Sequence, residues 1–228
     1  MRLSTTTALG LSALSILVLA GCSTSTEPTT STSSSTPTHQ DGTAKASGPL
    51  SSAQLSERLL SENDLGEGYT HAPQPAVRHD DVTVIGCPAL AELGGDTATT
   101  GSLSFPRKAK VSFTYASGSS SEMSEELYSD SAAKLSKGIG TVFDAMLSCP
   151  TYQVVSGSTV IDMGTAKTSA PPLGDERWSQ LLTYSAGGQS SVVKQTAIRT
   201  GNVLVILSGS PALVDAHLAD AVRAAQAR

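Results

Sequence analysis

The sequence predicts an α+β fold, in which amphipathic helices pack against an antiparallel β-sheet. Three observations indicate this class. The C-terminal third contains three candidate strands joined by short glycine-containing turns. Two segments with apolar residues at helical spacing flank these strands, one over 131–148 and one after Pro211. Strands and helices do not alternate regularly along the chain, as a parallel sheet would require.

The first 21 residues have the features of a bacterial export signal. Arg2 precedes an apolar run from Ala8 to Ala20, which is too short to cross a hydrocarbon layer of about 30 Å. The run ends in Leu19-Ala20-Gly21-Cys22, which matches the lipobox motif. In that motif the cysteine receives a diacylglycerol and becomes the first residue of the mature chain. The alternatives are an ordinary signal peptide with a coincidental cysteine, or a short anchor helix.

Lipidation of Cys22 would determine where the protein resides in the cell. Acyl chains such as palmitate would hold it firmly to a cell membrane, because each buried methylene contributes about 0.8 kcal/mol. The sequence therefore predicts a lipid-anchored protein on the extracytoplasmic face, with the bilayer as a partner through acylated Cys22.

Residues 22–50 are expected to form a disordered tether. After Cys22 the segment is rich in Ser, Thr and Pro, and it has too few apolar side chains to offset the entropy of ordering. Such a segment would span about 30 Å on average. Residues 51–228 are expected to form a single domain.

Six elements are expected in the first half of this domain. Ser51 and Ser52 can cap a helix, because their hydroxyls can accept hydrogen bonds from its first backbone amides. Glycine and proline predict a loop over Asn63–Pro75. The elements are a helix carrying Leu55, Leu59 and Leu60, that loop, a strand at Val82–Ile85, a helix at Pro88–Leu93 ended by Gly94 and Gly95, a strand at Val111–Ala116 and, from a more ambiguous pattern, a strand at Met123–Tyr128.

The second half is expected to contain two long helices and most of the sheet. A helix is predicted over Ser131–Ser148, although Gly138 and Gly140 weaken it by about 1 kcal/mol each relative to alanine. Val203–Leu207 does not alternate, which predicts a central strand covered on both faces. The other elements are a sheet segment at Gln153–Met163, strands at Arg177–Ala186, Ser191–Arg199 and Asn202–Ser208 with turns at Gly187-Gly188 and Thr200–Asn202, and a last helix capped by Ser210 that buries Val214, Leu218, Ala221, Val222 and Ala225.

Cys87 and Cys149 are the two cysteines left after lipidation of Cys22. Disulfides persist in oxidising compartments, so these two thiols are expected to bond to each other. A metal site, a redox pair and an intermolecular bond are the alternatives. Neither cysteine lies in a Cys-x-x-Cys motif, and no further ligands lie close in sequence.

Composition argues against two classes of partner. The chain carries 15 Lys and Arg against 20 Asp and Glu, so it lacks the basic balance of a nucleic-acid binder. Only 4% of its residues are aromatic, too few for the stacking surfaces of a typical sugar or single-strand binder.

Catalytic and metal-binding patterns are weak. No Gly-x-Ser-x-Gly elbow follows a strand, and His217 lies beside the apolar stripe of the last helix. His79-Asp80-Asp81 consists of consecutive residues, which diverge, whereas zinc ligands must converge. We therefore expect no enzyme activity, no cofactor and no metal. The alternative is an exported cell-envelope hydrolase whose site assembles from distant residues.

One segment, Pro171–Trp178, can be interpreted in two ways. It is a rigid turn into a strand with mixed charges and the single tryptophan. Asp175, Arg177 and Trp178 could form the rim of a binding cleft. Alternatively, Trp178 anchors the core while Asp175 orders the turn; this structural interpretation is the stronger one.

The order of these features resembles the PknH-like extracellular sensor domain of actinobacterial receptor kinases and stand-alone lipoproteins. The resemblance covers residues 51–228 and depends on the lipobox, the tether, the helix ending in Cys149-Pro150, Leu173-Gly174-Asp175, Arg199-Thr200-Gly201-Asn202-Val203 and the last helix. It implies an α+β domain with a cleft and a ligand-sensing role without established catalysis. The extracellular domain of the receptor kinase has two disulfides, whereas this chain has cysteines for one.

These features together predict a non-enzymatic lipoprotein whose sensor-like domain binds a small ligand or an envelope partner. Without a kinase or membrane-spanning segment it could bind or present a signal but could not transmit one across the bilayer. A solute-binding component of a transporter ranks last, because about 180 folded residues are few for two lobes.

Overall fold

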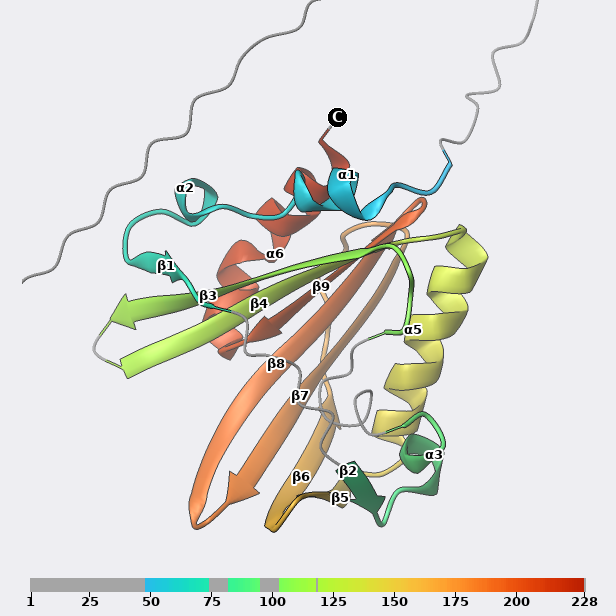
Figure 1. Ribbon diagram of the computed structural model, residues 1–228, viewed down its shortest axis with the longest axis vertical. Helices are drawn as coiled ribbons and strands as arrows, with labels where there is room; N and C mark the ends of the chain where they lie inside the picture. Colours follow the sequence, from blue (N-terminus) through green and yellow to red (C-terminus); the bar gives the residue numbers. More distant parts are fainter. Residues whose placement is uncertain (1–47, 74–81, 95–102, 118, 228) are drawn as a thin grey trace, which may run out of the picture. The chain divides into compact units, whose positions relative to one another are not determined.

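The computed structural model describes residues 48–73, 82–94, 103–117 and 119–227. These residues form a nine-stranded antiparallel sheet in the order β1-β3-β4-β9-β8-β7-β6-β5-β2, with helices on both faces (Figure 1). The predicted α+β class is confirmed. The elements are α1 (Ser52–Ser56), α2 (Glu62–Leu65), β1 (Tyr69–His71), β2 (Val82–Ile85), α3 (Pro88–Ala91), β3 (Lys108–Ser117), β4 (Ser119–Ser129), α5 (Ala132–Leu147), β5 (Thr151–Ser156), β6 (Thr159–Lys167), β7 (Glu176–Ala186), β8 (Gln189–Thr200), β9 (Val203–Gly209) and α6 (Pro211–Gln226).

Strand β9 is apolar on both faces and lies between β4 and β8. Val203, Val205 and Leu207 belong to a core beneath α1 and α6. Leu204 and Ile206 belong to a second core beneath α3 and α5. The prediction of a central strand covered on both faces is therefore confirmed, and alternate residues of one strand supply both cores.

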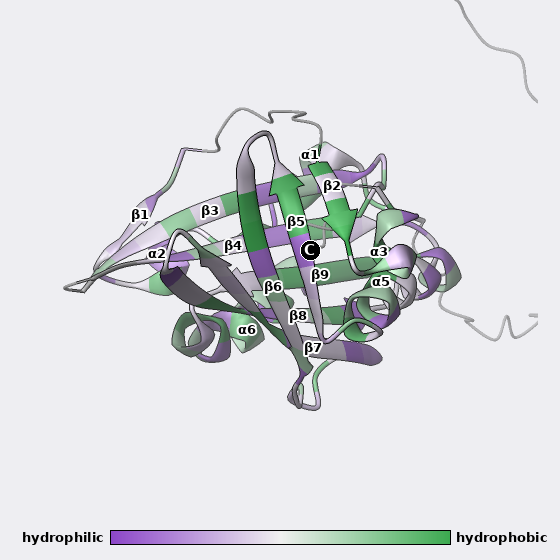
Figure 2. Ribbon diagram, turned by 90° about the horizontal axis from the view of Figure 1, so that it is seen from below, coloured by the Kyte–Doolittle hydropathy of each residue, from purple (hydrophilic) through white to green (hydrophobic). Residues whose placement is uncertain are grey.

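The two cores occupy opposite faces of the sheet. The first joins α1, α2 and α6 to β1, β3, β4, β8 and β9. Arg58, just after α1, donates from Nη1 to the Ala225 carbonyl of α6 at 2.9 Å. The second joins α3 and α5 to the strands from β5 to β9 and to β2. Figure 2 shows the apolar residues of β2 and β5 at this edge of the sheet.

The long helices begin and end where their patterns indicate. Ser131 is the N-cap and Ser148 the C-cap of α5, which matches the predicted span. Leu135, Ile139, Val142, Phe143 and Met146 form the buried stripe of this helix. Helix α6 begins with Pro211 after Ser210 and buries the predicted residues Val214, Leu218, Ala221, Val222 and Ala225.

The predicted loop over Asn63–Pro75 is wrong in part. It contains the end of α2 and the whole of β1, two short elements separated by Gly66 and Gly68. Ser61 N–H donates to the Asp64 carboxylate at 2.8 Å and starts the turn of α2. Strand β1 pairs with β3, and its Tyr69 ring lies 4.6 Å from that of Tyr115. Neither element has enough residues to show a period in the sequence.

The sheet segment predicted at Gln153–Met163 is two strands. Gly157, with φ of 56°, lies in the turn between β5 and β6, which pair antiparallel from Ser156 and Thr159 onward. The segment that was ambiguous, Met123–Tyr128, lies within β4 as predicted.

The first described residues are fixed to the domain by two hydrogen bonds, whose partners Asn202 and Ser129 are themselves joined by a third. Asn202 donates from Nδ2 to the Gly48 carbonyl at 2.6 Å, and Leu50 N–H donates to Ser129 Oγ at 2.8 Å. Ser129 Oγ in turn donates to the Asn202 carbonyl at 2.7 Å. The predicted signal peptide, Cys22 and residues up to 47 of the tether lie outside the described residues. Within the described ranges, no helix is both long enough and apolar enough to cross a membrane.

The predicted disulfide joins Cys87 to Cys149, with 5.7 Å between the two Cα atoms. Cys87 is the N-cap residue of α3, and Cys149 follows the C-cap of α5. The bond therefore ties the short helix to the end of the long one across 62 residues of chain. In the loop-entropy model such a closure stabilises the fold by about 4 kcal/mol.

Glu125 is a carboxyl group inside the first core. It is 0% exposed, its Oε2 accepts from Leu60 N–H at 2.7 Å, and its Oε1 has no hydrogen-bond partner. Burial raises the pKa of Glu125 to about 8, and the hydrogen bond from Leu60 lowers it only partly. The charge of Asp64 raises this pKa further.

We expect Glu125 to make folding pH-dependent. The unfolded side chain releases its proton near its ordinary pKa of 4.5, whereas the folded one holds the proton until about pH 8. The native state therefore binds more protons between these values, and the free energy of unfolding falls as pH rises, by on the order of a few kcal/mol. Urea unfolding of Glu125→Gln from about pH 5 to pH 9 should show this dependence reduced.

Glu122→Gln on the same strand is the matched control, because Glu122 is exposed. Its difference from the wild type should stay constant with pH. If Glu125→Gln and the wild type have parallel pH profiles, the carboxyl of Glu125 is ionised in the folded protein at neutral pH and the assignment is wrong.

Candidate functional site

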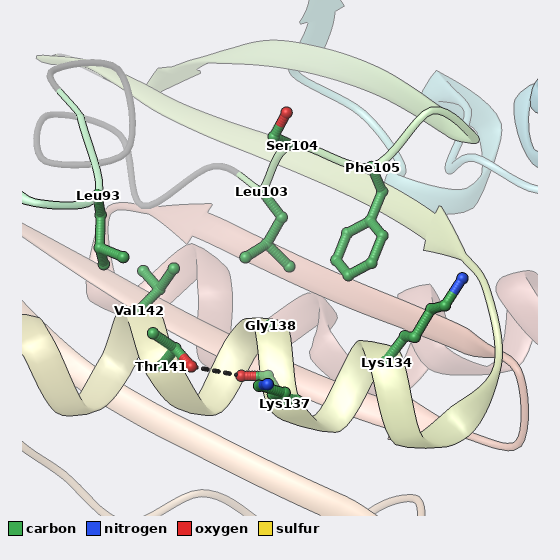
Figure 3. A pocket seen from close by; sticks show the side chains of 9 residues that line it. All are labelled: Leu93, Leu103, Ser104, Phe105, Lys134, Lys137, Gly138, Thr141 and Val142. Atoms are coloured by element: carbon green, nitrogen blue, oxygen red, sulfur yellow. Dashed lines mark hydrogen bonds between the residues drawn. The ribbon is translucent and has the colours of Figure 1, made fainter.

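A groove lies between α5 and the segment from Leu103 to Phe105. It has a volume of about 410 Å³, within the range of small-molecule sites. Figure 3 shows its lining side chains, which converge from α5, from the residues before β3 and from Leu93 beyond α3. The lining residues are Leu93, Leu103, Ser104, Phe105, Lys134, Lys137, Gly138, Thr141 and Val142.

Helix α5 lines the groove with a second stripe of residues, which lies beside its buried stripe. Lys134, Gly138 and Thr141 follow each other at spacings of four and three residues, which places them on one face of the helix. Val142 belongs to both stripes, since it lines the groove and is only 4% exposed. The core holds one side of α5 in place while the adjacent side remains available to a ligand.

Gly138 allows Phe105 to approach the helix closely. A Cβ atom built on Gly138 would lie 2.9 Å from Phe105 Cζ and 3.1 Å from Cε2, distances that require the ring to move. A Cβ atom built on Gly140 would have no neighbouring atom within 4 Å. Of the two glycines that weaken α5, one therefore makes room for the groove wall.

Tyr128 supports the groove wall formed by the Leu103–Phe105 segment. Its hydroxyl accepts from Leu103 N–H at 3.2 Å and donates to Glu126, which also accepts from Lys110 Nζ at 2.7 Å. The Tyr128 ring lies edge-on to Phe105, with 6.0 Å between centroids. These contacts hold the Leu103–Phe105 segment against β4.

The end of the groove near the start of α5 is positively charged. Lys134 lies in the first turn of α5, which contains no acidic residue, although helix N-termini favour anions. Lys134 Nζ lies 3.5 Å from Asp130 Oδ1, and its side chain is 70% exposed. The pKa of Asp130 is lowered by the hydrogen bond from Ser131 N–H, then by the charges of Lys134 and Arg107.

The predicted binding-rim residues lie elsewhere. Asp175 accepts at Oδ2 from Gly201 N–H at 2.8 Å and from Arg199 Nη1 at 3.0 Å. Glu176 binds Arg199 Nε at 3.0 Å, which lowers the pKa of Glu176. Asp175 thus fastens the start of β7 to the turn between β8 and β9.

Glycine is required at position 174, where the segment before β7 passes close to the end of β8. Its φ is 64°, and a Cβ atom there would lie 2.6 Å from the Arg199 carbonyl. Arg177 is exposed, and Trp178 packs half-buried against the second core. None of the three rim residues lines the groove, so a binding role for them stays a prediction.

The histidines in the described residues have structural contacts. His217 Nε2 lies 2.6 Å from Tyr69 Oη, and burial lowers the pKa of His217. His71 lies edge-on to Phe113. His79-Asp80-Asp81 and His39 lie outside the described residues. In the part of the chain that is described, no three His, Cys, Asp or Glu side chains gather as a metal site would need.

Sequence reasoning missed the groove. Its walls come from α5, from the Leu103–Phe105 segment about thirty residues earlier and from Leu93. The apolar residues Leu103 and Phe105 precede β3 without a period of their own. One signal was present: Lys134 and Lys137 precede Gly138 on a helix whose glycines otherwise have no explanation.

Comparison with known proteins supports the fold. No family model and no curated protein matches this chain. Among solved structures, the chain is similar to the crystal structure of the extracellular domain of PknH from Mycobacterium tuberculosis, with a TM-score of 0.58 and 13% sequence identity. The alignment covers 78% of this chain and 97% of that one. At this identity the likeness concerns the fold alone, so the fold that the resemblance to the PknH-like domain implied is confirmed.

We expect Gly138→Ala and Gly140→Ala to differ in stability. Each gains about 1 kcal/mol of helix propensity. At Gly138 the new methyl group must also displace Phe105 from the groove wall, which costs packing. The free energy of unfolding of Gly138→Ala should therefore be lower than that of Gly140→Ala by about 1 kcal/mol or more, as measured by urea denaturation. Equal gains at both positions would show that Phe105 does not rest on Gly138.

Proposed function

We propose that this chain is an extracytoplasmic lipoprotein whose sensor-like domain binds a small ligand in the groove beside α5. The observation that carries the binding role is the groove itself. It has a volume of about 410 Å³, four apolar side chains in its lining and two lysines at its margin. Binding sites of small molecules combine an apolar lining with a few placed polar groups.

Three observations support a location outside the cytoplasm. The lipobox at Leu19–Cys22 provides a lipidation site. The disulfide between Cys87 and Cys149 is of a kind that persists in oxidising compartments. The fold is similar to that of a domain described as extracellular. The bilayer is then the partner of Cys22, and the domain at the other end of the tether meets ligands of the envelope.

The groove favours a small molecule over an envelope protein as the ligand. Its described lining comes from α5, Leu93 and the Leu103–Phe105 segment and forms a concave surface. Stable protein interfaces bury about 800 Å² on each partner and contain large aromatic anchors. Among the described residues that line this groove, Phe105 is the only aromatic one.

Lipidation can be tested on the full-length chain by mass spectrometry. Between Arg2 and Lys45 there is no lysine or arginine. The N-terminal tryptic peptide of the mature protein should therefore run from Cys22 to Lys45 and carry the mass of a diacylglycerol. Cys22→Ser should abolish incorporation of labelled palmitate, while Cys87→Ser should leave it unchanged. A mature N-terminus at any other residue contradicts the proposal.

Ligand binding can be tested by thermal unfolding in two envelope extracts, one aqueous and one in organic solvent. Ligand at about one hundred times its Kd adds about 2.7 kcal/mol to the free energy of unfolding. We expect one extract to raise the Tm of the wild type by several degrees. Thr141→Trp should fill the groove and abolish this shift, whereas Ala133→Trp, on the exposed side of the same helix, should retain it. A shift that survives Thr141→Trp places the ligand elsewhere.

A further inference from the structure

The groove is chemically divided along its length. Figure 3 shows Leu93 at one end and Lys134 at the other, with Leu103, Val142 and Phe105 between them. Leu103 is 6% exposed and Val142 is 4% exposed. These two largely buried side chains form the apolar floor of the groove. A ligand that fills the groove would therefore contact hydrocarbon along most of its length and positive charge at one end.

The charged end has a surplus of cations. Lys134 shares Asp130 with the nearby charge of Arg107. No ion pair of Lys137 occurs among the residues that the structure describes. The backbone N–H groups at the N-terminus of α5 add a partial positive charge. No acidic side chain lies in the first turn, and Asp130, just before it, accepts from Ser131 N–H at 2.7 Å. An anionic group at this end would meet the ammonium group of Lys134 and a favourable helix dipole, with Lys137 one helical turn further along the groove.

The groove offers few other polar groups. Ser104 and Thr141 supply hydroxyls, and the Thr141 hydroxyl already donates to the Lys137 carbonyl at 2.8 Å. A sugar or nucleoside ligand needs several converging donors and acceptors, because its buried hydroxyls must be paired. Such a set does not occur among the described lining residues, which argues against these two classes of ligand.

We propose that the groove binds a single-chain anionic amphiphile, such as a fatty acid. The inference rests on the proposed function, because it names the ligand of that same groove. The hydrocarbon chain lies along Leu93, Leu103 and Val142 and passes the Phe105 ring. The carboxylate lies between Lys134 and Lys137. The volume of about 410 Å³ suits one chain, and the open side of the groove leaves the head group partly in water.

The test uses the full chain in bilayer discs of zwitterionic lipid, with empty discs as background. Displacement of a fluorescent fatty acid measures the affinity for octanoate, decanoate and dodecanoate. A fully buried methylene changes affinity about fourfold, and the open side should reduce this to about twofold per methylene. Dodecanol, which has the same chain without the charge, should bind at least about tenfold more weakly than dodecanoate.

Two double variants separate the charge of the groove from that of the surface. Lys134→Gln with Lys137→Gln should weaken dodecanoate about tenfold and leave dodecanol unchanged, because both residues are exposed and only the head group contacts them. Lys108→Gln with Lys167→Gln removes two exposed lysines outside the groove and should change neither. Salt should weaken dodecanoate in the wild type more than in the Lys134/Lys137 variant.

Each contrary result would overturn a specific part of these two proposals. If dodecanoate and dodecanol bind equally, or if the two double variants behave alike, no anionic head group is recognised. If neither binds but an envelope extract gives a Tm shift that Thr141→Trp abolishes, the ligand class is wrong while the proposed function stands. If no probe and no extract acts on the groove, both proposals fail. Binding only to vesicles of anionic lipid, without displacement of the fluorescent probe, would make the lysines a membrane contact.

Discussion

The burial of β9 on both faces is the constraint on which the rest of the structure depends. Its alternate residues enter two cores, so α6 with α1 must cover one face and α5 with α3 the other. Neither helical layer could be lost without exposing a row of aliphatic side chains to water. The strands beside β9 then extend the sheet to the edges formed by β1 and β2.

The candidate site follows from this arrangement. Because the core holds one stripe of α5, the neighbouring stripe is presented to the Leu103–Phe105 segment in a fixed orientation. Tyr128 holds one wall through Leu103, and the Cys87–Cys149 bond ties α3, which precedes Leu93, to the end of α5. A groove between elements that are each anchored to the core needs no rearrangement to admit a ligand, which limits the entropy lost on binding.

The sequence predicted the elements whose signals are local and long. Helices α5 and α6, strand β9 and the disulfide could be inferred from periodicity, an unbroken apolar run and two remaining cysteines. Helix α2 and β1 were missed because each is too short to show a repeating pattern, and β1 is defined by its pairing with β3. The groove could not be predicted because it depends on Phe105 meeting Gly138, a contact between segments that no local pattern relates.

The short strands at the two margins of the sheet also bear on how copies of the chain meet. β1 has three residues and β2 has four, and Ser52 Oγ accepts from Lys108 N–H on the part of β3 that extends past β1. Sheet margins with many free amides recruit other chains and lead to aggregation. Copies that the proposed lipid anchor gathered on one membrane would collide often, and the short edge strands offer few backbone groups for stable pairing between sheets.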